Sequence, residues 1–151
     1  MSDVLSFGNP VFQQFAFYSG LVIGKTLLMG PITSFFRLSH DTYSNEEDCK
    51  LSKDKSLKPR FNDLTVERIR RCHQNDVENV VPFVLFGLFY VATEPYPEVA
   101  SILFRTFAAS RFLHTACYMV PLPQPSRFVC FLTGVGVTGA MAFRVFMTSS
   151  M

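Results

Sequence analysis

Four long apolar stretches most constrain the fold of this 151-residue chain. A helix that crosses a membrane needs about 20 mostly apolar residues, because a backbone facing lipid must satisfy its own hydrogen bonds. The sequence therefore predicts an all-α, integral membrane four-helix bundle, folded as a single membrane domain over residues 1–151. We expect helices at about 11–36, 76–93, 99–119 and 126–147, and a loop at about 38–75. A water-soluble bundle is the alternative, although few polar residues remain to cover its outer surface.

The basic residues indicate how such a bundle is oriented. More than half of the 14 Lys and Arg residues lie in the segment 38–74. Because Lys and Arg are enriched in cytoplasmic loops, we expect this loop and the VPLPQPS connection to face the cytoplasm. The TEPYPE connection and both termini would then face the other side. The first ten residues have neither a basic leader nor a small-residue cleavage site, which indicates a retained anchor.

Several classes of function are disfavoured by charge and by motif. A net charge of +2 gives no reason to expect a nucleic-acid partner. The four cysteines, at 49, 72, 117 and 130, have no metal-ligand spacing, so neither a metal site nor a disulfide framework is expected. A thiol nucleophile at Cys72 beside His73 is disfavoured, because adjacent residues on a helix point in different directions. No P-loop, GxGxxG, HExxH or GxSxG motif is present.

Polar residues within the apolar segments suggest a binding site. Charge inside a membrane segment is costly and therefore suggests a function by default. Two sets of three polar residues each share one face of a predicted helix. Both sets, and two arginines at the ends of the other two helices, are expected at the same depth near the cytoplasmic face. These residues are Arg71, Asn75 and Glu78; Arg111, His114 and Tyr118; and Arg37 and Arg127. They fit a small zwitterionic or polyanionic ligand, because guanidinium groups bind carboxylates in forked hydrogen bonds. The alternative is that they pair with one another, extend to lipid headgroups or hold helices together.

Two further features are expected to serve the bundle itself. Lys25, a charge at membrane depth, is expected to pair with Asp76 or Glu78. Two pairs of small residues, each spaced by four, are expected to let helices approach closely. These pairs are Gly20 with Gly24, and Gly136 with Ala140.

A resemblance to a known family rests on three segments: FRLSHDTYSNEEDC, VERIRRCHQNDVENVVPF and SRFLHTACYMVPLPQPSR. Together with the four-segment layout, they resemble the MAPEG family of membrane-associated proteins in eicosanoid and glutathione metabolism, above all its glutathione transferase branch. The resemblance runs from about Val11 to Met147. It implies a homotrimer in the lipid bilayer that binds glutathione between subunits near the cytosolic face. It also implies the endoplasmic reticulum as the location, with the mitochondrial outer membrane as a second site.

The resemblance assigns roles to particular residues. Glutathione contacts are implied for Arg37, Arg71, Asn75, Glu78, His114 and Tyr118, and the helix face shared with His114 and Tyr118 adds Arg111. Arg127 matches an arginine at the glutathione thiol, where a positive charge would lower the thiol pKa and stabilise the thiolate. Asp48 matches an acidic residue that assists catalysis in the prostaglandin E synthase branch. Cys49 matches a regulatory cysteine whose modification raises activity, and an inert loop thiol is the alternative reading.

The implied activity is conjugation of the glutathione thiolate to hydrophobic electrophiles, together with reduction of lipid hydroperoxides. Glutathione is the co-substrate, and no metal and no protein nucleophile is required. The alternatives are a prostaglandin E synthase-type isomerase and a non-enzymatic membrane protein that binds lipid or glutathione. Phe128 and Phe131 stand where the isomerase branch has a small hydroxyl residue and a tyrosine, and Gln74 stands where it has an arginine. These differences favour the transferase.

Overall fold

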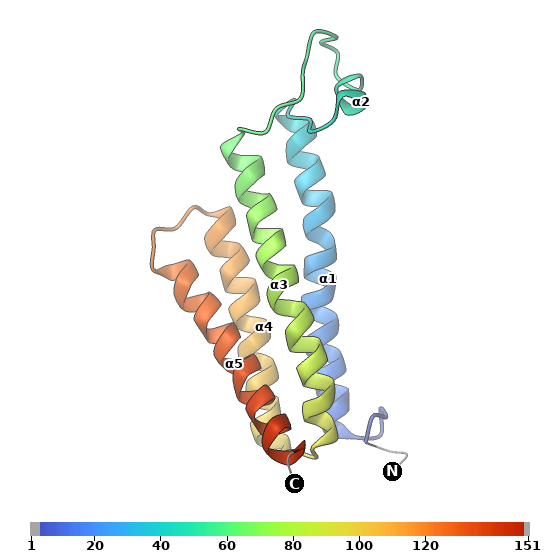
Figure 1. Cartoon of the computed structure of the whole chain (residues 1–151), viewed down its shortest axis with the longest axis vertical. Coiled ribbons are helices and arrows are strands. Elements are labelled where there is room, and N and C mark those ends of the chain that lie inside the picture. Colours follow the sequence, from blue (N-terminus) through green and yellow to red (C-terminus); the bar gives the residue numbers. More distant parts are fainter. Residues whose placement is uncertain (1–3, 150–151) are drawn as a thin grey trace.

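The computed structural model describes residues 4–149 and is built from helices. These are α1 (Pro10–Ser39), α2 (Glu46–Cys49), α3 (Leu64–Ala92), α4 (Pro97–Met119) and α5 (Ser126–Ser149). The four long helices run alternately up and down, and α2 is a single short turn beside the end of α1 (Figure 1). No strand occurs within residues 4–149. The predicted all-α class is confirmed, and α2 is an additional element that was not predicted.

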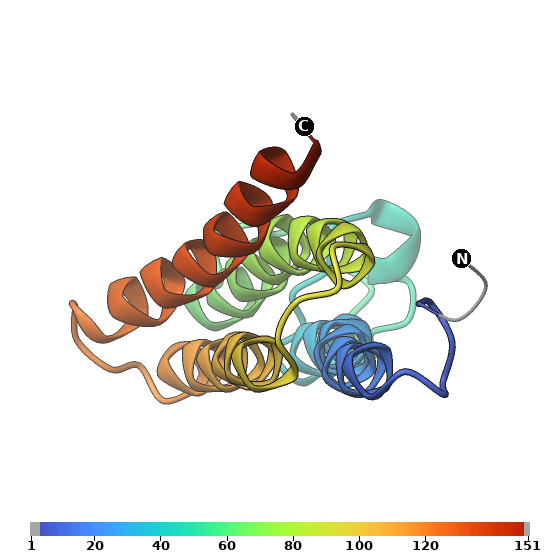
Figure 2. The same ribbon diagram turned by 90° about the horizontal axis from the view of Figure 1, so that it is seen from below.

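The connections lie at the two ends of the bundle in the predicted grouping. The α1–α3 connection, which carries α2, and the α4–α5 connection lie at one end, whereas the α3–α4 turn and both ends of the described chain lie at the other (Figure 1). Figure 2 shows α5 running obliquely across α3 and α4. Helix α1 packs against α3 and α4, on the side away from α5.

Helix α3 begins at Leu64 and not at Asp76, so the loop prediction of 38–75 was too long at its C-terminal end. Asp63 is the N-cap, and its side chain accepts hydrogen bonds from the backbone N–H groups of Thr65 and Val66, each at 2.9 Å. Hydrogen bonds from Val66 and from the His40 side chain hold the pKa of the Asp63 carboxyl below its usual range. The charged stretch before Asp76 is thus helical, which gives its polar residues fixed directions.

Phenylalanine rings fill the centre of the bundle. Phe15 of α1, Phe83 of α3, and Phe104 and Phe107 of α4 are each exposed by no more than 3%. The Phe83 and Phe107 rings stack with their centroids 3.7 Å apart and their planes within 3° of each other. In a bilayer, such close van der Waals packing is a main source of helix association, because lipid tails are as apolar as the side chains.

Some glycines let side chains of neighbouring helices pack closely against the backbone, but they are not the glycines that were predicted to do so. A Cβ added at Gly87 would lie 2.2 Å from the Phe15 ring, and one added at Gly134 would lie 3.3 Å from the Ser110 hydroxyl. At Gly20, Gly24 and Gly136, an added Cβ would meet no atom of the described residues within 4 Å. Within one chain the small-residue prediction was therefore wrong, because the space beside those glycines is open.

Replacing Gly87 with alanine is expected to lower the free energy of unfolding by about 1–3 kcal/mol, because overpacking displaces the buried Phe15 ring. Gly20→Ala is the matched control, since it adds the same methyl group in open space. Thermal unfolding of both variants in detergent measures the difference. Equal midpoints for the two variants would contradict the packing described here.

The outer surface of the bundle is strongly apolar. By length and composition, α1 and α5 could each cross a membrane. Exposed side chains of α1 include Phe17, Leu27 and Phe35, and those of α5 include Phe143 and Phe146, each at least 60% exposed. Helices α3 and α4 are not among the helices that meet this criterion.

Candidate functional site

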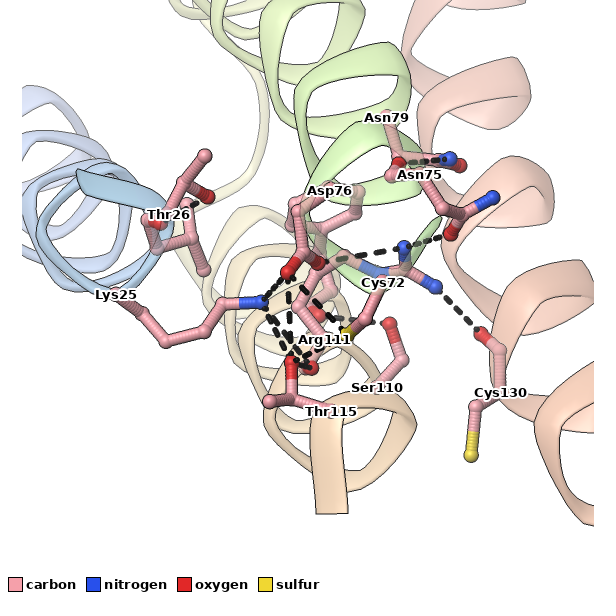
Figure 3. Close-up of polar contacts among 12 residues, drawn as sticks. Lys25, Thr26, Cys72, Asn75, Asp76, Asn79, Ser110, Arg111, Thr115 and Cys130 are labelled. Carbon is pink, nitrogen blue, oxygen red and sulfur yellow. Dashed lines mark hydrogen bonds and ion pairs between the residues drawn. The ribbon is translucent and has the colours of Figure 1, made fainter. Parts of the chain in front are cut away.

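Three charged side chains meet inside the bundle, each from a different helix (Figure 3). The ammonium of Lys25 on α1 lies 2.6 Å from Oδ2 of Asp76 on α3, and Nη1 of Arg111 on α4 lies 3.8 Å from Oδ1 of the same carboxylate. The Asp76 and Arg111 side chains are fully buried. The predicted pairing of Lys25 is confirmed, with Asp76 as its partner. We call Lys25, Asp76 and Arg111 the buried charge cluster.

The sequence analysis did not single out Asp76 as a site residue. A signal was present, because Asp76 lies four residues after Cys72 and four before Val80, and both of these are buried. A carboxylate on that apolar face of α3 must find a cation, since an unpaired buried charge is very costly.

Neutral polar groups complete the cluster. Lys25 donates to the Thr115 hydroxyl at 2.9 Å, and that hydroxyl lies 3.4 Å from Asp76 Oδ2 and 3.1 Å from the Arg111 carbonyl. The Cys72 thiol is fully buried and lies 4.0 Å from Asp76 Oδ2. One buried carboxylate therefore balances two cations inside the bundle, and Oδ2 makes closer contacts than Oδ1.

Arg111 links three helices rather than facing outward. Its Nη1 donates to Oδ1 of Asn75 on α3 at 3.0 Å, and its Nη2 donates to the carbonyl of Cys130 on α5 at 3.4 Å. For Arg111 the geometry favours the alternative of holding helices together over the predicted direct contact with a ligand.

A second polar group lies where α4 ends and α5 begins. The His114 and Tyr118 rings are 5.0 Å apart, and the Arg127 guanidinium lies 4.8 Å from the centre of the Tyr118 ring. Cation–π contacts of this kind hold a guanidinium in place without using its hydrogen-bond donors. Within residues 4–149, Nδ1 of His114 and Nε of Arg127 are buried without a hydrogen-bond partner. Buried polar atoms normally have partners, so this group is suited to receive a ligand.

The remaining predicted contacts lie on the outside of the bundle or at its end. Arg71 and Glu78 are exposed on α3, and Glu78 accepts a hydrogen bond from Gln74 at 3.1 Å. Arg37 is partly buried in the last turn of α1, and its Nε has no partner within residues 4–149. In the single chain, only some of the predicted glutathione contacts therefore lie together: Arg111 with Asn75, which share a hydrogen bond, and the group around Tyr118.

Asp48 and Cys49 belong to α2, which lies on the opposite side of the bundle from the start of α5 (Figures 1 and 2). Asp48 accepts a hydrogen bond from Asn45 at 2.9 Å, and Cys49 is buried at 6% exposure. One chain thus does not bring the predicted catalytic residues Asp48 and Arg127 together. Among residues 4–149, no group of three or more His, Cys, Asp or Glu side chains could hold a metal ion.

Comparison with known families settles the resemblance that the motifs indicated. The MAPEG family profile matches residues 15–147, which span every polar residue described above. The chain belongs to the MAPEG family.

Several known proteins resemble this chain along most of its length. It is 42% identical to the human (Homo sapiens) microsomal glutathione S-transferase 1 over 139 residues, which cover 91% of this chain and 90% of that protein. The Rattus norvegicus protein of the same name is 40% identical over the same shares. Similarity to the Bos taurus prostaglandin E synthase is lower, at 31% over 91% of this chain and 88% of that protein.

Proposed function

We propose that this MAPEG protein is a membrane-bound glutathione transferase that conjugates the glutathione thiolate to hydrophobic electrophiles. The observation that carries the proposal is the 42% identity to a microsomal glutathione S-transferase over 91% of the chain. The lower identity to prostaglandin E synthase, 31%, makes the isomerase the second candidate. The group around Tyr118 supports the same chemistry, because it holds a cation with an unpartnered donor.

In this mechanism, Arg127 sits beside the glutathione sulfur. Its positive charge lowers the thiol pKa, so that the thiol proton leaves to solvent and the thiolate accumulates. The sulfur then forms a bond to an electrophilic carbon, and a leaving group such as a halide departs with the bonding electrons. With a lipid hydroperoxide, two glutathione molecules become a disulfide, and the hydroperoxide becomes an alcohol and water. Asp48 assists from a neighbouring chain.

Glutathione has two carboxylates and one ammonium, and Arg37, Arg71 and Glu78 match these groups by charge. Arg37 and Arg71 bind the carboxylates, Glu78 binds the ammonium, and His114 and Tyr118 contact the tripeptide near the sulfur. Asn75 also contacts glutathione. Arg111 does not contact the tripeptide but holds the Asn75 side chain from inside the bundle. Cys49 remains a proposed regulatory thiol, and its burial means that modification requires α2 to move.

We also propose that the protein is a homotrimer with four membrane-spanning helices per chain, located in the endoplasmic reticulum with its site facing the cytosol. Two observations support this arrangement. The outer faces of α1 and α5 are apolar enough for lipid or for other subunits, and α2 is remote from the start of α5 within one chain. Native mass spectrometry of the detergent complex is expected to give the mass of three chains, and a monomer with full activity would contradict the proposal.

The test of the activity is direct. Purified protein in detergent is incubated with glutathione and a hydrophobic aryl halide, and the conjugate is quantified against a reaction without protein. The proposal expects turnover that depends on glutathione. Glutathione binding without product would favour a non-enzymatic binding protein, and isomerisation of a prostaglandin endoperoxide without conjugation would favour the synthase.

A further inference from the structure

We infer that Lys25 is a positioning residue: it restrains Asp76 so that Arg111 stays hydrogen-bonded to Asn75 and fixes the Asn75 amide as a hydrogen-bond donor toward glutathione. This inference rests on the proposed function. It concerns a lysine that lies inside the bundle with 9% of its side chain exposed and that donates to the backbone carbonyl of Arg111 at 3.4 Å.

The first step is the orientation of the Asn75 amide. Arg111 Nη1 lies 3.0 Å from the Asn75 amide, and a guanidinium has donors only, so the atom that faces it must be the oxygen Oδ1. The amide nitrogen Nδ2 then points away from Arg111 (Figure 3). Asn75 is partly exposed, and it shares a helix face with Arg71 and Glu78. It therefore offers a donor to an acceptor on the ligand, which is a carboxylate or a peptide carbonyl.

The Asp76 carboxylate determines whether Arg111 stays in that position. A buried carboxylate beside an arginine is frequently bound in a forked, two-bond arrangement. Here Asp76 Oδ1 is buried and has no hydrogen-bond partner among the described residues, although Arg111 Nη1 is only 3.8 Å away. The other oxygen, Oδ2, lies 2.6 Å from Lys25 and 3.4 Å from the Thr115 hydroxyl. The carboxylate is thus drawn toward α1, and Arg111 Nη1 remains available to Asn75.

Removing the lysine would release this restraint. In Lys25→Met, the Asp76 carboxylate has one cation left and can form the forked pair with Arg111. That pair rotates the guanidinium toward Asp76, which lengthens the hydrogen bond from Nη1 to Asn75. The Asn75 amide then loses its fixed orientation. Asp76 Oδ1 already lies 3.8 Å from Arg111 Nη1, so a small rotation of the two groups is sufficient for the exchange.

In Lys25→Met, the affinity for glutathione should therefore fall, while the free energy of unfolding should stay the same or rise. The buried charge cluster contains two cations and one carboxylate, and Lys25→Met leaves one of each. The variant should consequently be at least as stable as the wild type, because replacing a buried charge by an apolar side chain of similar length is often neutral or stabilising. A merely structural role for Lys25 would lower stability and leave the glutathione site intact in the protein that folds.

The experiment measures glutathione binding by equilibrium dialysis and thermal unfolding on the same detergent-purified samples. Lys25→Met is expected to raise the dissociation constant of glutathione roughly tenfold, the usual effect of losing one hydrogen bond to a charged group. KM for glutathione should rise with it while kcat changes little, because the contact is made equally in the ground and transition states. Lys25→Arg, which keeps a cation on Asp76, should restore most of the affinity. Lys53→Met, in the exposed loop, is the matched control.

Two further variants keep the inference open to refutation if Lys25→Met does not fold. Thr115→Val removes the second group on Asp76 Oδ2 and should weaken glutathione binding in the same direction. Asn75→Asp retains an acceptor for Arg111 but presents a carboxylate oxygen to the ligand, so it should weaken binding at least as much as Lys25→Met. Unchanged binding in Thr115→Val or in Asn75→Asp would overturn the inference.

The outcomes separate this inference from the proposed function. Absence of glutathione binding by the wild-type protein would overturn both. Binding by the wild type together with equal binding by Lys25→Met would overturn the inference and leave the proposed function standing. Weaker binding with unchanged or higher stability would support it.

Discussion

Replacing Arg127 with alanine is expected to lower kcat/KM for glutathione conjugation by about 100-fold or more, the usual loss when one charge-stabilising donor is removed from a reaction centre. The reason is that thiolate formation loses its nearby positive charge, while the contacts to the rest of the tripeptide remain. Steady-state kinetics with an aryl halide measure the effect, and glutathione binding is measured on the same samples.

Two variants make the Arg127 result specific. Arg105→Ala removes an exposed arginine from the half of α4 that lies away from the α4–α5 connection, so it controls for the loss of an arginine as such. Arg127→Lys keeps the charge but not the planar group on Tyr118, and it should retain part of the activity. Full activity in Arg127→Ala would remove Arg127 from the mechanism.

Replacing Asp76 with alanine is expected to produce the largest loss of stability among the substitutions considered, about 3–5 kcal/mol or complete loss of folded protein. The substitution leaves Lys25 and Arg111 as two buried cations with no carboxylate between them. Thermal unfolding in detergent and the yield of folded protein measure the effect.

The control for this substitution is Glu78→Ala. Glu78 is also a carboxylate of α3, only two residues further along the helix, but it is exposed and contacts Gln74 alone among the hydrogen bonds of the described residues. Its loss should change stability little, because exposed polar contacts contribute little. An Asp76→Ala protein as stable as Glu78→Ala would show that the buried charge cluster does not hold the helices together.

Hydropathy predicted the helical class and three of the four long helices closely, because apolar length is the strongest signal in such a chain. It misplaced the start of α3, since the segment 64–75 is charged and its helix is specified by the Asp63 N-cap and by its attachment to an apolar continuation. Helix α2, with four residues, is too short to carry a periodic signal.

The site was predictable in part. Spacing on single helices placed Asn75 on one helix face and His114 with Tyr118 on another. The pairing of Lys25 was expected from its charge at membrane depth, with Asp76 or Glu78 as the partner, and the structure shows Asp76. Spacing could not reveal that Arg111 is fully buried, because helix periodicity gives a direction and not the identity of what packs there. It also could not show that α2 and the start of α5 are remote in one chain, which depends on how the helices are arranged in space.

The central claim is that this protein binds glutathione as its thiolate at Arg127. The most direct measurement is the ultraviolet difference spectrum recorded when glutathione is added to the detergent-purified protein, with Arg127→Ala run alongside. The wild type should show a thiolate absorption that is absent in the variant, although both bind glutathione. Equal thiolate absorption in the two proteins, or glutathione bound by the wild type with no thiolate signal, would contradict it.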